Sequence, residues 1–158
     1  FSESIQKNIE FGNPSATIDE VKRAAILSEI DSEILKFKKG YETILGERGV
    51  TLSGGQVQRL SIARSFIKDS EIYLFDDCFS SLDSDTEDKI IKNLNNNFKG
   101  KTLLIVSHRV SCVKNADKII VLEKGRIIQD GTHNQLIKKE GFYKDLHLKQ
   151  NSEINTEI

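Results

Sequence analysis

The sequence has no methionine, no tryptophan, one proline and only two cysteines among its 158 residues. Cys78 and Cys112 lie far apart without Cys-x-x-Cys spacing, which argues against a disulfide framework or a zinc site. The longest apolar runs, such as Leu103 to Val106, have four residues, so no stretch suits a membrane span or a targeting signal. The net charge of −1 gives no overall field that favours nucleic acid or anionic lipid. The length suits one domain with a buried core.

The most informative stretch runs from Thr51 to Ile67. Ser53, Gly54 and Gly55 have almost no side-chain bulk, and the residues that follow repeat at helical spacing. The pattern predicts a helix with an open N-terminus, whose unpaired N–H groups and partial positive charge attract an anion. Because glycine lacks a Cβ atom, a large anion can approach closely, and we expect a phosphate. Without further context, a Gly-Gly pair is more often a plain turn before a helix.

The neighbouring residues favour a phosphate site over a plain turn. Leu52-Ser53-Gly54-Gly55-Gln56, followed by Gln58-Arg59 and Ala63-Arg64, resembles the signature motif of ATP-binding-cassette (ABC) ATPases. The resemblance implies that Ser53, Gly54, Gly55 and Gln56 bind ATP as cofactor. In that family the signature acts in trans, closing over the γ-phosphate of ATP held by the phosphate-binding loop of a second subunit.

Two short apolar runs end in polar residues. Residues 72–75 precede Asp76 and Asp77, and residues 103–106 precede Ser107 and His108. Such runs predict strands buried on both faces of a parallel sheet. In open α/β sheets, ligands bind beyond the carboxyl ends of the strands, so we expect these polar side chains at a ligand crevice.

The family resemblance gives these residues roles. Asp76 resembles the Walker B aspartate, which binds the Mg²⁺ of the nucleotide, and His108 resembles the switch histidine that contacts the γ-phosphate. Asp77 stands where the family usually has a glutamate that polarises the attacking water. Because aspartate reaches about 1.5 Å less far, we expect slow hydrolysis at this site. Ser80-Ser81-Leu82-Asp83 matches the loop that couples the two nucleotide sites, and Asp83 also suits a helix start.

The remaining pattern predicts helices over 19–29 and 32–38, and a helix after a capping box formed by Ser84 and Glu87. Strands over 118–122 and 126–130 form a hairpin through Gly125. A second capping box at Thr132 and Gln135 starts a final helical region that breaks near Gly141.

The fold class expected from these elements is α/β, a partial P-loop NTPase-like ABC ATPase fold. We expect a helical subdomain with the signature over 1–69, an α/β core portion with Walker B and the switch histidine over 70–149, and a tail over 150–158. Residues 1–12 resemble the segment after the glutamine-bearing loop of ABC domains, so the chain resembles the later part of a larger domain. Gly46-Glu47-Arg48-Gly49 resembles a segment that ABC exporters place against their transmembrane domains.

The sequence contains no Gly-x-x-x-x-Gly-Lys-Ser/Thr loop for the α- and β-phosphates. We therefore expect the 158 residues alone neither to bind ATP tightly nor to hydrolyse it. The resemblance implies an ABC exporter ATPase on the cytoplasmic side of the cell membrane, with a second nucleotide-binding domain and a transmembrane domain as partners, and with neither nucleic acid binding nor membrane insertion by this chain.

Two alternatives stay open. The first is a degenerate, non-catalytic half that supplies its signature to the ATP site of a partner subunit. The second is a DNA-repair or chromosome-maintenance ATPase, which is disfavoured because those chains insert a long coiled coil where this one has only residues 14–49.

Overall fold

The computed structural model describes residues 2–46 and 49–156, so Glu47 and Arg48 of the predicted exporter segment lie outside the described residues. The chain forms two compact units, residues 1–106 and 107–158. The predicted boundaries at residues 69 and 149 concern subdomains and remain predictions. In the part of the chain that the structure describes, no helix has the length and apolar character needed to cross a bilayer.

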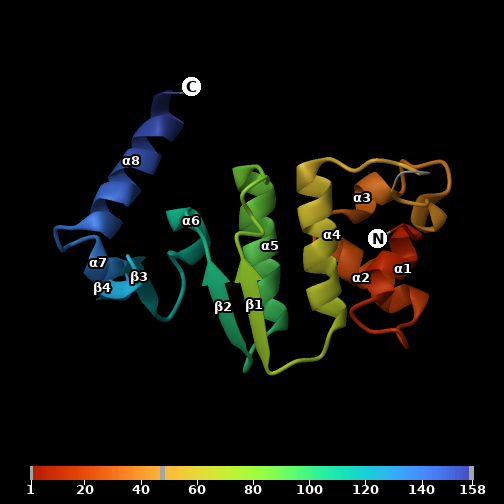
Figure 1. Cartoon of the computed structure of the whole chain (residues 1–158), viewed down its shortest axis with the longest axis horizontal. Coiled ribbons are helices and arrows are strands. Elements are labelled where there is room, and N and C mark those ends of the chain that lie inside the picture. Colours follow the sequence, from red (N-terminus) through yellow and green to blue (C-terminus); the bar gives the residue numbers. More distant parts are fainter. Residues whose placement is uncertain (1, 47–48, 157–158) are drawn as a thin grey trace. The chain divides into compact units, whose positions relative to one another are not determined.

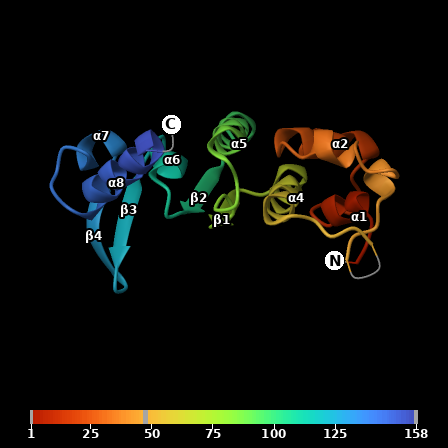
Figure 2. The same cartoon turned by 90° about the horizontal axis from the view of Figure 1, so that it is seen from above.

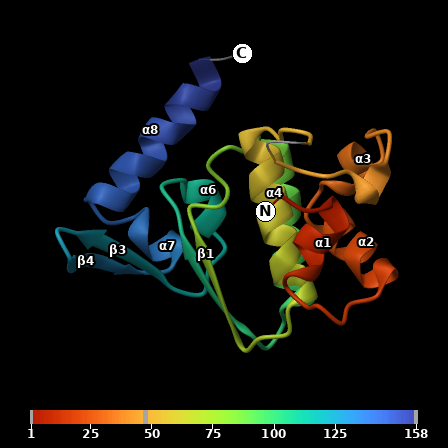
Figure 3. The same cartoon turned by 45° about the vertical axis from the view of Figure 1, so that its right-hand side comes forward.

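The first unit begins with a group of helices that pack around one core (Figure 3). They are α1 (Ile5–Glu10), α2 (Ile18–Leu27), the short α3 (Asp31–Ile34), the 3₁₀ turn η1 (Gly40–Glu42) and α4 (Gly54–Ile67). A capping box between Thr17 and Glu20 starts α2, one residue before the predicted helix. Leu27 is half-buried and Ile26 is exposed, so Leu27 belongs to the packed face. The fully buried members of the core include Ile5, Ile9, Val21, Ala25, Ile34 and Ala63.

The first unit continues with a βαβ unit, as the sequence predicts. Strands β1 (Ile72–Asp76) and β2 (Thr102–Val106) pair in parallel, with α5 (Ser84–Asn97) between them in the chain. Figure 1 shows the two strands side by side. The start of α5 follows the prediction for Asp83 and not the capping box predicted at Ser84 and Glu87, because Asp83 is the N-cap and accepts a hydrogen bond from the N–H of Thr86. A carboxylate one residue earlier takes the capping position from Ser84, and Glu87 is buried.

Within the described chain the two-stranded sheet is covered on one face only, which corrects the expectation of strands buried on both faces. Tyr73 and Phe75 are buried, and the Tyr73 ring stacks on Phe98 with the centroids 4.0 Å apart. Figure 2 shows α5 against this face. Leu74 and Leu104, on the other face, are 65% and 55% exposed. Burial alternates along each strand because the side chains alternate and one helix covers one face.

The second unit is built on an antiparallel hairpin. It consists of α6 (Val110–Val113), β3 (Ile119–Glu123), β4 (Arg126–Gly131), α7 (His133–Leu136) and α8 (Phe142–Thr156). Lys124 and Gly125 both have positive φ, which forms the tight turn predicted at this glycine. Thr132 and Gln135 form the predicted capping box. After a break at Gly141, α8 continues to Thr156, so residues 150–156 of the predicted tail are helical.

Candidate functional site

The N-terminus of α4 carries the signature residues. Its N–H groups are partly satisfied by a capping box, in which the N–H of Ser53 donates to Gln56 Oε1 at 2.8 Å and the N–H of Gln56 donates to Ser53 Oγ at 3.3 Å. The first N–H groups of a helix have no intrahelical acceptor. The capping box therefore leaves Gly54 and Gly55 as the residues whose N–H groups are directed out of the helix end. Ser53 and Gly54 are exposed, so this helix end has the open form expected for an anion site.

The Gln56 side chain is used within the chain. Its Nε2 donates to Glu33 Oε2 at 2.6 Å, and Glu33 Oε1 pairs with Arg59 Nη2 at 2.7 Å. Arg59 Nη1 also donates to the carbonyl of Glu29 at 2.8 Å. Burial acts to raise the pKa of the Glu33 carboxyl, and the hydrogen bonds from Gln56 and Arg59 outweigh it and hold the pKa below its ordinary value. This network fixes the first turns of α4 to α3, through Glu33, and to the segment that joins α2 and α3, through Glu29.

The loop after β1 lies directly against the start of α4. Gln58 Nε2 donates to Ser80 Oγ at 2.9 Å, and the N–H of Ser81 donates to Gln58 Oε1 at 2.9 Å. A Cβ atom on Gly55 would lie 3.0 Å from the carbonyl oxygen of Ser81. Glycine at this position therefore allows the loop to pack closely, and Gln58 ties the loop to the helix.

Asp76 and Asp77 lie at the carboxyl end of β1, as predicted, and both are exposed. Asp77 has φ of +47°, and its N–H donates to the carbonyl of Val106 at 3.0 Å, so this residue turns the chain away from the sheet. An open cleft of about 270 Å³ between α4 and β1 is lined by Asp76 and Cys78 among others. Burial raises the pKa of the Cys78 thiol to about 11, so Cys78 is a protonated packing residue at neutral pH.

The carboxylates do not form a complete metal-binding cluster by themselves. Among residues 2–46 and 49–156, no three His, Cys, Asp or Glu side chains are grouped to hold a metal ion. Magnesium is commonly held by one or two carboxylates together with phosphate oxygens and water. The exposed carboxylate of Asp76 fits that mode of binding, in which a nucleotide would supply the remaining oxygens.

Asp83 serves as a helix cap in the structure. The backbone N–H of Thr86 donates to its carboxylate at 2.9 Å, and this hydrogen bond lowers the pKa of Asp83. The sequence predicted that Asp83 combines a helix start with a coupling role. The first role is confirmed, and the second remains a prediction because it concerns a partner.

His108 lies in the second unit, in the loop between β2 and α6, and is exposed. Its carbonyl oxygen accepts a hydrogen bond from Gln150 Nε2 at 2.8 Å. The N–H of Val110 donates to Oε1 of the same glutamine at 2.9 Å. A side chain of α8 therefore holds the backbone on both sides of Arg109.

The structure brings part of the predicted site together. Residues 53–56 and the loop that includes residues 76–83 belong to one unit and are linked by Gln58, while His108 belongs to the other unit. Sequence analysis assigned no role to Glu33, Gln58 or Gln150. Gln58 stands within the signature segment, which was the one available signal, whereas Glu33 and Gln150 stand in no motif.

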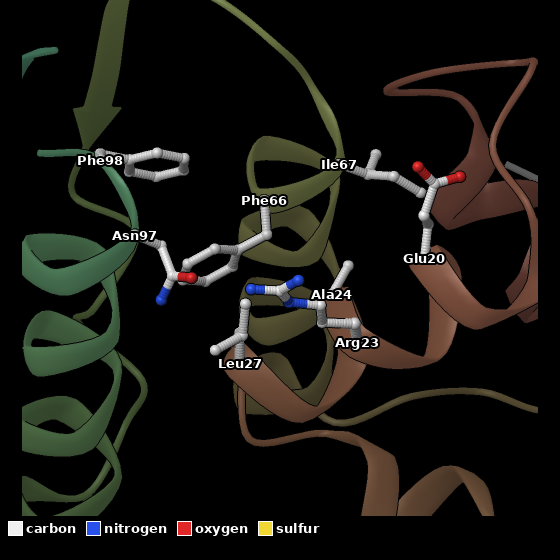
Figure 4. A pocket seen from close by; sticks show the side chains of 8 residues that line it. All are labelled: Glu20, Arg23, Ala24, Leu27, Phe66, Ile67, Asn97 and Phe98. Carbon is white, nitrogen blue, oxygen red and sulfur yellow. The ribbon is translucent and has the colours of Figure 1, made fainter.

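A second cleft lies away from the signature residues. It has a volume of about 220 Å³ and is lined by residues of α2, the end of α4 and the end of α5, including Arg23, Phe66 and Phe98. Figure 4 shows Phe66 and Leu27 pointing into it, with the Arg23 guanidinium beside them. Phe66 and Ser53 are at opposite ends of α4, so this cleft is separate from the candidate phosphate site.

Comparisons with known proteins agree with one another, the family model over about half of the chain and the relatives over nearly all of it. A family model described as ABC transporter matches residues 3–80. The mitochondrial potassium channel ATP-binding subunit of Xenopus tropicalis is 46% identical over 153 residues, which cover 97% of this chain and 22% of that protein. The multidrug resistance-like ATP-binding protein MdlA of Buchnera aphidicola is 46% identical over 159 residues, covering 100% of this chain and 27% of that protein.

A solved structure is similar to this chain as well. The structure of a bacterial Atm1-family ABC exporter with ATP bound superposes with a TM-score of 0.87 at 36% sequence identity, covering 95% of this chain and 26% of that chain. The chain thus spans about a quarter of the length of these proteins.

Proposed function

We propose, for a chain that belongs to the ABC transporter family as part of an exporter-type nucleotide-binding domain, that the start of α4 binds the terminal phosphate of ATP carried by a second nucleotide-binding domain. The family and the partial P-loop NTPase-like fold predicted from the sequence are both confirmed by the matches. The observation that carries the proposal is the open helix end, where the capping box of Ser53 and Gln56 leaves the N–H groups of Gly54 and Gly55 unused.

The other predicted residues have complementary roles in this proposal. Asp76 would hold Mg²⁺, and a magnesium ion bound there would supply positive charge to the phosphate oxygens. Asp77 orients the attacking water, and its short reach makes this step slow. His108 contacts the γ-phosphate from the second unit. Asp83 caps α5 and thereby fixes the end of the loop that Gln58 ties to the signature helix.

For the whole protein, we propose that ATP closes two nucleotide-binding domains, as a homo- or heterodimer, and that this closure drives a transmembrane domain on the cytoplasmic side of a membrane. Hydrolysis then resets the dimer. The similar Atm1-family exporter was solved with ATP bound, which supports ATP as the nucleotide. The names of the relatives as ATP-binding proteins support it as well.

The charge of the bound group provides the test. Gly54→Asp places a carboxylate at the proposed phosphate site, and Gly54→Asn places a neutral side chain of similar size there. A Cβ atom at Gly54 has ordinary contact distance to Ser81 Oγ, 3.4 Å, so both side chains start from an uncrowded position. In full-length protein we expect Gly54→Asp to lower ATP hydrolysis about 100-fold and Gly54→Asn to lower it much less, by the electrostatic cost of a like charge beside phosphate.

Binding of ATP is the matching control. ATP is held mainly by the phosphate-binding loop of the other domain in this proposal, so Gly54→Asp is expected to leave ATP binding at low temperature nearly unchanged. Equal hydrolysis by the Asp and Asn variants would show that no phosphate lies at this helix end.

One observation favours a second candidate, a non-catalytic half that supplies its signature to the ATP site of a partner. Asp77 replaces the glutamate usual in the family, while the signature segment is intact. A mixed dimer separates the two functions. If Gly54→Asp in this subunit abolishes hydrolysis while Asp76→Asn in the same subunit has no effect, the chain serves only the site of its partner.

A further inference from the structure

We infer that Gln150 is a positioning residue for His108, setting the orientation of the histidine loop from helix α8. The inference rests on the proposed function, in which His108 contacts the γ-phosphate. It assigns a role to a residue in the stretch that the sequence indicated only as a tail. Both residues belong to the second unit.

The geometry of the contact is that of a clamp on two successive peptide groups. Gln150 Nε2 donates to the His108 carbonyl at 2.8 Å, and Gln150 Oε1 accepts the N–H of Val110 at 2.9 Å. One planar amide thus uses its donor end and its acceptor end at the same time. The peptide between residues 108 and 109 and the peptide between 109 and 110 are both fixed. Fixing the His108 carbonyl restricts ψ of that residue, and with it the direction of the imidazole.

The part of α8 that carries Gln150 packs against the hydrophobic core of the second unit. Val110 is 4% exposed and packs in a core with Ile119, Val121, Leu136 and Tyr143, and Leu146 packs against the same core. Residues 143, 146 and 150 share one face of α8 by helical spacing. The glutamine therefore projects from a helix face that is already held in place. Figure 2 shows α6 and α8 next to each other, in agreement with the contacts between these helices.

The contact also explains how α6 begins without a capping side chain of its own. The N-cap residue, Arg109, makes no side-chain cap hydrogen bond to the helix. Oε1 of Gln150 supplies an acceptor to Val110, the first residue of α6. If Gln150 had a purely structural role, its loss would only destabilise α6. The positioning role requires in addition that the loss of Gln150 affects catalysis through His108.

A double-mutant cycle on the full-length protein separates the two roles. The variants are Gln150→Ala, His108→Ala and the combination, with the kcat and KM of ATP hydrolysis measured for each. We expect Gln150→Ala to lower kcat about tenfold with KM changed by less than about twofold, because a displaced loop misplaces a group used in the chemical step. In the His108→Ala background, we expect Gln150→Ala to cause no further loss beyond about twofold.

Two further variants give matched controls. Gln150→Glu keeps the acceptor for Val110 but replaces the donor to the His108 carbonyl by a carboxylate oxygen, so we expect it to lose at least as much activity as Gln150→Ala. Asn151→Ala removes the neighbouring amide, which bonds His147 Nε2 at 3.1 Å and not the histidine loop, and we expect it to retain full activity. If Gln150→Ala lowers the yield of folded protein, Gln150→Glu carries the test.

The outcomes distinguish this inference from the proposed function. If His108→Ala lowers kcat and Gln150→Ala does not, the positioning role is wrong while the proposed function stands. If Gln150→Ala lowers kcat by the same factor with and without His108, Gln150 acts independently and the inference is likewise wrong. If His108→Ala leaves kcat unchanged, the role proposed for His108 fails and the inference fails with it. The Gly54→Asp and Gly54→Asn pair then still tests phosphate binding by the first unit.

Discussion

The loop after β1 and the loop that carries His108 are held by the same kind of bond from very different places in the sequence. Gln58 bonds Ser80 Oγ and the N–H of Ser81, and Gln150 bonds the His108 carbonyl and the N–H of Val110. In each case a single amide side chain donates and accepts. Gln58 comes from the signature helix itself, whereas Gln150 comes from α8, 42 residues after His108.

The difference determines which element moves when each loop is displaced. In the first unit, the signature helix and the loop after β1 are joined directly, so displacement of either one moves the other. In the second unit, the histidine loop is joined to the core under the hairpin through Val110 and Gln150. In the proposed function, the start of α4 is therefore connected to the loop that carries Asp77 by the side chain of Gln58.

The start of α4 and the loop after β1 are in close contact at Gly55. Gly55→Ala brings a Cβ atom within 3.0 Å of the Ser81 carbonyl oxygen, which is backbone and must move to accommodate it. The loop must give by a few tenths of an ångström, and because a displacement of about 1 Å can cost about 100-fold, we expect kcat/KM for ATP hydrolysis by full-length protein to fall about 20-fold. Gly54→Ala meets Ser81 Oγ at 3.4 Å and is the matched control, with a smaller loss expected. The reverse order would show that close packing against Ser81 is unimportant.

The next prediction is an increase in the rate of ATP hydrolysis. Asp77→Glu lengthens the side chain by about 1.5 Å, and we expect the single-turnover rate of ATP hydrolysis to rise at least about tenfold. The positive φ of Asp77 is more easily adopted by Asp than by Glu, so the variant loses a little stability while it gains reach. Asp76→Glu changes the reach of the neighbouring carboxylate and is expected to lower the rate. An unchanged rate in Asp77→Glu would contradict the argument from side-chain length.

The third prediction concerns Gln58, which ties the loop after β1 to the signature helix. Gln58→Ala removes the hydrogen bonds of this side chain to the Asp77 carbonyl, Ser80 Oγ and the Ser81 N–H, and we expect kcat to fall about threefold to tenfold. The loss is smaller than for Gly55→Ala because the loop is released and not pushed aside. Gln58→Glu keeps the acceptor for the Ser81 N–H and is expected to retain part of the activity. A loss for Gln58→Ala that also appears at full size in the His108→Ala background would indicate that the two loops work independently.

Sequence analysis predicted the elements whose signals are local. The βαβ unit, the hairpin at Gly125 and the box at Thr132 depend on neighbouring residues, and all are present. The error at Ser84 was also local, because Asp83 competes for the same capping position. The burial of β1 and β2 was predicted wrongly, since apolar composition does not reveal how many faces of a sheet are covered within a chain.

The contacts that hold the candidate site were less accessible to prediction. The bonds of Gln56 to Glu33 and of Gln150 to His108 join residues 23 and 42 positions apart. Such pairs leave no periodic pattern, and a glutamine or glutamate on a helix surface is ordinarily a solvated side chain. Chemical roles at Asp76, Asp77 and His108 were predicted through family resemblance and remain predictions that kinetics will test.

The smallest effect concerns Glu33, which anchors the signature helix through Gln56 and Arg59. Its pKa is held below the ordinary value of 4.5, so the carboxylate contributes stability at neutral pH, and this contribution is lost as pH falls through the lowered pKa. Glu33→Gln is therefore expected to cost about 1 kcal/mol near neutral pH, or about 2–4 °C in the melting temperature of a domain of this size. Glu29→Gln leaves the hydrogen bond from Arg59 to the Glu29 carbonyl in place and serves as control.

The pH dependence tests whether the charge of Glu33 is responsible. Because protonation of Glu33 makes wild type resemble the variant, the difference in melting temperature should narrow below about pH 4. A difference that stays constant from neutral to acid pH would show that the charge of Glu33 does not hold the helix.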